Sequence, residues 1–127
     1  MRFYRIVSLA AIGIAASLVS LTLSQAQVAQ CNTRGNWAGW GENGAATFDL
    51  GAGQACSIGV NTYGHIEKTR VARQAQHGKV TQIDLSNFEY RPDPGFTGTD
   101  SFVLEGTGHD PGGPAEASTV TMTVNVR

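Results

Sequence analysis

The feature that most constrains the fold of this chain is the strict alternation of apolar and polar residues near its C-terminus. Val120, Met122, Val124 and Val126 fall on one side of this pattern, with three threonines and an asparagine on the other. Successive side chains of a β-strand point to opposite faces, so a period of two predicts a strand with one face in a core. Burial of each apolar side chain is worth about 1.5–3 kcal/mol.

A rigid corner precedes this strand in the sequence. Residues 88–91 alternate aromatic with charged residues, which predicts a short strand, and residues 101–105 predict the next one. Two prolines between them cannot donate to a sheet, so the first strand must end there, and two glycines allow tight turns. The corner consists of Pro92, Pro94, Gly95, Phe96 and Gly98.

Short apolar runs separated by turn residues occupy the rest of the chain. Further strands are predicted at 46–50, 57–62 and 66–75, with a return strand that begins at Val80. Residues 76–79 predict a hairpin turn with Gly78 at positive φ, and residues 84–87 a second turn. We expect loops at 107–114 and in the glycine-rich remainder of 32–55. No segment after Gln27 repeats at helical spacing, which indicates an all-β sandwich.

The N-terminus has the pattern of a secretory signal peptide. Residues 1–5 contain two arginines and no acid, an apolar run follows to Leu23, and Ser24-Gln25-Ala26 offers small residues at a cleavage site. We therefore predict a signal peptide over 1–26 and a periplasmic or secreted protein. An uncleaved anchor is the alternative, because an apolar run of 18 residues approaches the length that spans a bilayer.

Both cysteines, Cys31 and Cys56, lie after the predicted cleavage site. An isolated pair in an exported chain is expected to form a disulfide, which would close a loop of 25 residues and contribute about 3.5 kcal/mol. A metal site or catalytic thiol is the rival interpretation, but the chain lacks a CxxC pair. Lipid attachment at Cys31 is a further alternative, although Gln30 is not the small residue that normally precedes a lipidated cysteine.

Cleavage would leave 101 residues, which suit one domain and are too few for two. Within this domain, residues 27–55 form a glycine-rich segment held by the predicted Cys31–Cys56 disulfide, and residues 56–127 form the core. Seven basic and ten acidic residues remain, so the net charge is −3. This balance does not favour nucleic acid or an anionic membrane as a partner, and no membrane span is expected after cleavage.

The corner and the last strand together resemble bacterial immunoglobulin-like and cadherin-like modules, which occur as tandem repeats in surface and secreted proteins. Their pattern is Y-x-P-x-x-G-F-x-G-x-D-x-F, with His-Gly before it and a T-V-x-V-x-V strand after it. The chain matches it at His77-Gly78, Tyr90, Pro92, Gly95, Phe96, Gly98, Asp100, Phe102 and residues 120–126. The resemblance implies an immunoglobulin-like Greek-key β-sandwich without catalytic activity. The chain departs from the family in having Ala75 where a proline is usual, and a single copy of the pattern.

Cadherin-like modules often bind calcium through loop carboxylates, which makes calcium the alternative to having no cofactor. The candidate ligands are Asp93, Asp100 and Asp110, but the acidic cluster that normally supplies six or more oxygens is missing. We expect Asp100 instead to accept backbone N–H bonds in the turn. We also expect Phe96 to be a buried aromatic whose loss costs about 3–5 kcal/mol.

No set of residues points to catalysis. Ser101 lacks the flanking glycines of a nucleophile elbow, and His65 and His77 lie in predicted turns. His109 stands beside Asp110, but no ligand spacing supports a metal site there. We therefore expect that the protein is not an enzyme.

The expected function is a binding or structural role at the cell envelope or outside the cell, with another protein as partner. That partner would approach loops or an exposed strand edge. One alternative is a carbohydrate-binding module that uses Trp37 and Trp40, although both rings could simply fix their loop to the sandwich. The other is an accessory or inhibitor subunit of an exported enzyme, whose loop 107–114 enters a partner's cleft.

Overall fold

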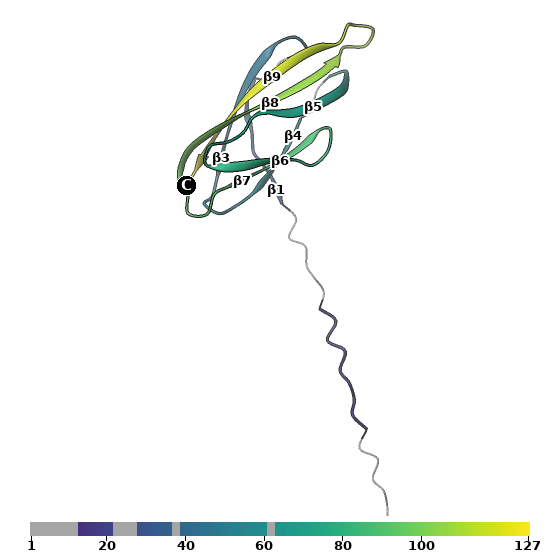
Figure 1. Ribbon diagram of the computed structural model, residues 1–127, viewed down its shortest axis with the longest axis vertical. Helices are drawn as coiled ribbons and strands as arrows, with labels where there is room; N and C mark the ends of the chain where they lie inside the picture. Colours follow the sequence, from purple (N-terminus) through teal and green to yellow (C-terminus); the bar gives the residue numbers. More distant parts are fainter. Residues whose placement is uncertain (1–12, 22–27, 37–38, 61–62) are drawn as a thin grey trace, which may run out of the picture.

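The computed structural model describes residues 13–21, 28–36, 39–60 and 63–127, and this part of the chain is an all-β sandwich of two sheets (Figure 1). Most of the predicted signal peptide and its cleavage site lie outside the described residues. Residues 13–21 are exposed and have no regular secondary structure. Within the described ranges, no helix has the length and apolar character needed to cross a membrane.

The four-stranded sheet has the order β1-β4-β7-β6. Its strands are β1 (Ala29–Gln30), β4 (Cys56–Gly59), β7 (Asn87–Pro92) and β6 (Gly78–Gln82). The five-stranded sheet has the order β2-β3-β9-β8-β5. Its strands are β2 (Arg34–Asn36), β3 (Asn43–Leu50), β9 (Glu116–Val126), β8 (Gly98–His109) and β5 (His65–Arg73). Neighbours are antiparallel, except that β1 runs parallel to β4 and β3 parallel to β9.

The connections give an immunoglobulin-like Greek key. The chain crosses between the sheets from β4 to β5, from β5 to β6 and from β7 to β8, and it makes hairpins from β6 to β7 and from β8 to β9. The orders β1-β4-β7-β6 and β9-β8-β5 match the ABED and GFC sheets of a constant-type immunoglobulin domain. β3 and β2 extend the second sheet beyond β9.

The core lies between the sheets and is centred on three aromatic rings. Tyr90 of β7 stacks on Phe102 of β8 at 5.5 Å and meets Phe48 of β3 edge-on at 5.9 Å. The alternating face of β9 reaches this cluster as predicted, because Met122 and Val124 are fully buried. The core residues are Ala46, Phe48, Cys56, Ile58, Val80, Phe88, Tyr90, Phe102, Leu104, Met122, Val124 and Val126.

The loop expected around the strand predicted at 46–50 is wrong at residues 34–36 and 43–45, which lie in strands. Residues 34–36 form β2, and β3 already begins at Asn43 and pairs with β9 over eight residues. Phe48 on β3 is fully buried. The glycine content concealed only the first three residues of this strand, because their stabilisation comes from a partner far along the chain rather than from local propensity.

The hairpin turn predicted at 76–79 is also wrong. β5 and β6 belong to different sheets, so residues 74–77 carry the chain across the sandwich. Gly78 lies in β6 and does not have a positive φ. A glycine is needed there for space, since a Cβ would lie 2.6 Å from the carbonyl oxygen of Arg91 and 2.8 Å from the Tyr90 ring.

Candidate functional site

The loop end of the sandwich is defined here by the described residues of the connections β4–β5, β6–β7 and β8–β9, which are Val60, 63–64, 83–86 and 110–115. In the described part of the chain after Val28, the large apolar side chains that are exposed all lie here. Tyr63 is 83% exposed, Ile83 59% and Leu85 44%. Figure 1 shows the β8–β9 hairpin projecting past the β6–β7 turn at this end. β8 continues to His109, so residues 107–109 of the loop predicted at 107–114 belong to a strand.

Hydrogen bonds hold the β6–β7 turn in place. The N–H of Val60 donates to the carbonyl of Ser86 at 2.7 Å, and the Thr69 hydroxyl donates to the carbonyl of Leu85 at 2.7 Å. The Asp84 carboxylate accepts the N–H groups of Ser86 and Asn87, each at 2.8 Å, and these bonds lower the pKa of Asp84. The apolar side chains therefore stand on a turn whose backbone is already ordered.

Trp40 closes the sandwich at this end. Its indole N–H donates to the carbonyl of Tyr63 at 3.0 Å, and the ring lies against the backbone of Gly106 and Gly108 in β8. The Ser118 hydroxyl fixes the same segment by accepting the Gly41 N–H at 2.9 Å and donating to the Gly39 carbonyl at 3.0 Å. Trp40 also covers an apolar cavity of about 30 Å³ between the sheets. Trp37, the other half of the proposed platform, lies outside the described residues.

The residues of the corner pattern, from Tyr90 to Phe102, lie at the opposite end of the sandwich and have a packing role. Asp100 is only 3% exposed, and its carboxylate accepts four bonds, from the N–H groups of Gln76, His77 and Ser101 and from the Tyr90 hydroxyl. The expected turn acceptor thus reaches across the sandwich as well as along its own strand. Burial and this hydrogen bond raise the pKa of the Tyr90 phenol.

The remaining corner residues shape the turn itself. Pro92 is buried at the end of β7, while Gly95 and Gly98 take φ values of 78° and 131° that favour glycine. Phe102 is fully buried. Phe96 is only partly buried, contrary to expectation, because its ring stacks on His77 at 4.4 Å at the margin of the core.

The three aspartates suggested for calcium do not form a group that could hold a metal ion within the described residues. Both carboxylate oxygens of Asp100 are occupied by protein donors, and Asp93 and Asp110 are exposed in separate turns. The structure does bring together two histidines that we interpreted separately from the sequence. His65 and His109 face each other directly across β5 and β8, although 44 positions separate them in the sequence.

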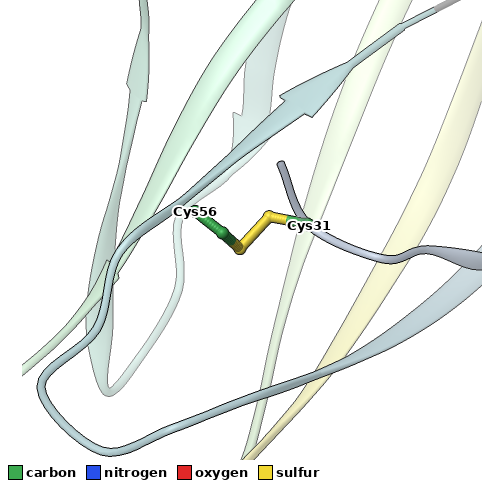
Figure 2. Close-up of a disulfide and its surroundings, with 2 residues drawn as sticks. All are labelled: Cys31 and Cys56. Carbon is green, nitrogen blue, oxygen red and sulfur yellow. A yellow bond between two sulfur atoms is a disulfide. The ribbon is translucent and has the colours of Figure 1, made fainter. Parts of the chain in front are cut away.

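A disulfide joins Cys31 to Cys56, as predicted, with Cα atoms 5.0 Å apart (Figure 2). It ties the residue that follows β1 to the first residue of β4, so it lies along one sheet rather than between the two. Because the Cys31 sulfur is bonded to Cys56, it is not available for a lipid thioether. The disulfide indicates an oxidising environment outside the cytoplasm.

Comparisons with known proteins find little. No protein-family model matches the chain, and no curated protein matches it. Among solved structures, the chain is similar to the bradyzoite-specific antigen BSR4 of Toxoplasma gondii, with 12% sequence identity and a TM-score of 0.35. The match covers 76% of this chain and 52% of that one, about half its length. Similarity at this level supports no inference about function.

Proposed function

We propose that this protein is an exported, non-catalytic immunoglobulin-like domain that binds another protein through its loop end, in the periplasm or outside the cell. The observation that carries the proposal is that Tyr63, Ile83 and Leu85 are all exposed and lie on the β4–β5 and β6–β7 connections, at the same end of the sandwich. Large exposed apolar side chains are common at protein-binding surfaces, and immunoglobulin-like folds present their loops at the ends of the sandwich.

The ordered backbone of the β6–β7 turn favours binding. Thr69 and Val60 hold the β6–β7 turn, and the Trp40 indole holds the carbonyl of Tyr63. A surface that is ordered before a partner arrives loses less conformational entropy on association. Aromatic anchors such as Tyr63 are enriched among the residues that dominate binding energy at interfaces.

The strand edges offer a partner less than the loops do. The Gln74 side chain occupies the open edge of β6, because its amide donates to the Val80 carbonyl at 2.7 Å and accepts the Val80 N–H at 3.0 Å. β5 carries two register shifts and several charged side chains, which are features that discourage strand addition. We therefore favour the loops over the edges of β5 and β6.

Export to the periplasm or the medium is part of the same proposal. The signal-peptide pattern of residues 1–26 and the Cys31–Cys56 disulfide both support it. N-terminal sequencing of the protein recovered from outside the cytoplasm should begin at Gln27. A chain recovered with residues 1–26 still attached would favour the anchor instead.

The carbohydrate-binding alternative has less support from the geometry. The Trp40 ring packs on two glycines and its N–H already donates a hydrogen bond. Part of the ring is therefore covered and cannot stack on a sugar. The accessory-subunit alternative survives in a narrower form. Its loop comprises residues 110–115 rather than 107–114, and it would act within the same loop end.

Site-specific photo-crosslinking in the cell of origin tests the proposal. The photoreactive residue p-benzoylphenylalanine replaces Tyr63 in one variant and Thr97, exposed in the corner at the opposite end, in the matched control. We expect a discrete protein adduct from position 63 and none from position 97. The adduct should disappear when Leu85→Asp is added, while the melting temperature stays close to that of the parent. Equal labelling at both positions, or none at either, would show that the loop end is not the binding surface.

A further inference from the structure

The charged side chains of the domain are distributed unevenly between the two ends of the sandwich. Five acidic residues lie in the loop end or on the strand ends next to it, namely Glu42, Glu67, Asp84, Asp110 and Glu116. Glu42 directly precedes β3, Glu67 is the third residue of β5 and Glu116 is the first residue of β9. The register of β3 with β9 and of β5 with β8 places these strand ends beside the β8–β9 hairpin.

The lysines and arginines lie mostly elsewhere. None of the seven that follow the predicted cleavage site belongs to the described residues of the loop end. Lys79 and Arg91 are opposite in register beside the corner, and Arg127 is at the C-terminus, which Figure 1 shows at the end opposite the β8–β9 hairpin. Lys68 follows Glu67 on β5 and offsets one of the five negative charges. The loop end and its surroundings are therefore acidic.

Ion pairs divide the acidic residues in the same way. The acids that pair with arginine lie in the middle or at the far end of their strands: Asp49 with Arg34 and Arg127, Glu89 with Arg91, and Glu105 with Arg70. Within the described residues, none of the five acids around the loop end forms a salt bridge with a lysine or an arginine. Asp84 accepts only uncharged N–H groups, which lower its pKa and so favour its charged form.

We propose that the partner of the loop end is a basic protein, whose lysine or arginine side chains contact these acids while its apolar groups contact Tyr63, Ile83 and Leu85. The inference rests on the proposed function and specifies the chemistry of the partner. Protein interfaces commonly combine an apolar centre with a polar rim. Opposite charges on the two rims speed association and select one partner over others.

The same charges disfavour other occupants of the loop end. A second copy of this chain, joined through the same end, would bring five acids against five and so would be repelled. An anionic membrane surface would be repelled as well. The described residues contain no group of three His, Cys or acidic side chains that could hold a metal ion, so a metal site does not account for the acids.

Photo-crosslinking from p-benzoylphenylalanine at position 63, in the cell of origin, can test the charge of the partner. One variant adds Asp110→Asn and Glu116→Gln, which remove two exposed acids around the loop end. The matched control adds Glu89→Gln and Asp93→Asn, which remove the same charge away from it. We expect the yield of the adduct to fall at least about threefold in the first variant and to stay unchanged in the control. All melting temperatures should remain close to that of the parent.

Mass spectrometry of the cross-linked peptide then identifies the partner and the residues around its contact. We expect lysines or arginines to outnumber acids there. The association rate of the two purified proteins should fall at least about tenfold when salt is raised from about 0.05 to about 0.5 M. Equal adduct yields from the two charge variants, or a contact without an excess of basic residues, would overturn this proposal and leave protein binding at the loop end standing. The absence of any adduct from position 63 would overturn both.

Discussion

At the scale of single residues, the structure depends most visibly on Asp100. Its buried carboxylate joins the β5–β6 connection, β7 and the start of β8 through four hydrogen bonds of 2.8–3.1 Å. A buried charge is tolerated only when donors replace its lost hydration, and here three backbone N–H groups and the Tyr90 hydroxyl do so. These four donors therefore explain why an aspartate, rather than a neutral polar residue, stands at this position of the motif.

Asp100→Asn should destabilise the fold strongly. In either orientation the new amide NH₂ would face at least one backbone N–H, so a buried donor loses its acceptor and a charge-assisted set of bonds is lost. We expect the free energy of unfolding to fall by about 2–4 kcal/mol in urea titrations. Asp93→Asn is the matched control, because Asp93 is exposed at the same corner. Equal midpoints for the two variants would contradict this account of Asp100.

The Tyr90 phenol gives the fold a distinct response to alkali. Burial raises its pKa in the folded state above the ordinary value of 10.0. Above pH 10 the unfolded chain loses this proton while the folded chain keeps it, so stability falls as the pH rises. The expected slope is up to about 1.4 kcal/mol per pH unit in urea titrations between pH 10 and 11.5. Tyr90→Phe should lose this component and the exposed Tyr63→Phe should keep it, whereas identical slopes would show that Tyr90 ionises freely when folded.

At the scale of elements, close approach between β6 and β7 imposes a glycine. Gly78→Ala would press its methyl group onto the Arg91 carbonyl and the Tyr90 ring, at 2.6 Å and 2.8 Å. We expect a loss of about 1–3 kcal/mol, measured by thermal and urea unfolding. Gly59→Ala in β4 is the control, since its Cβ would meet nothing closer than 3.8 Å, and a change within about 0.5 kcal/mol is expected. If Gly78→Ala left the free energy of unfolding unchanged, the two strands would have to separate easily to make room for the methyl group.

The elements that could be predicted from the sequence are those with a local signal. The alternation of residues 120–126 and of residues 88–91 identified the cores of β9 and β7, and the prolines correctly ended β7 at Pro92. A strand was predicted at 46–50, but the first three residues of β3 and the whole of β2 were missed, because the pairing of β3 with β9 is not local. The turn at 76–79 was misread because turn residues do not specify which sheet the next strand joins.

The candidate sites were harder to predict for the same reason. Tyr63 and Leu85 belong to different connections, and only the fold brings those connections to one end. His65 and His109 become neighbours through the register of β5 with β8, which no spacing in the sequence reveals. The disulfide was predictable because the chain has only two cysteines, which leaves a single pairing.

At the scale of the whole molecule, the two sheets are held together without a disulfide between them, since the Cys31–Cys56 bond lies along one sheet. Phe48 and Phe102 from one sheet enclose Tyr90 from the other, and the hydroxyl of Tyr90 bonds across to Asp100. The disulfide, by contrast, joins two segments at the edge of the four-stranded sheet. Its contribution to stability should therefore be separable from the sandwich itself.

Replacing both cysteines, Cys31→Ala with Cys56→Ala, tests that separation. The disulfide closes a loop of 25 residues, so its loss should cost about 3.5 kcal/mol through the greater freedom of the unfolded chain. The far-ultraviolet circular dichroism of the folded variant should remain that of a β-sandwich, because the aromatic core is untouched. Reduction of the wild type in urea should reproduce the loss, and reductant should have no effect on the double variant. A double variant that is unfolded in buffer would show that the two sheets alone do not sustain the domain.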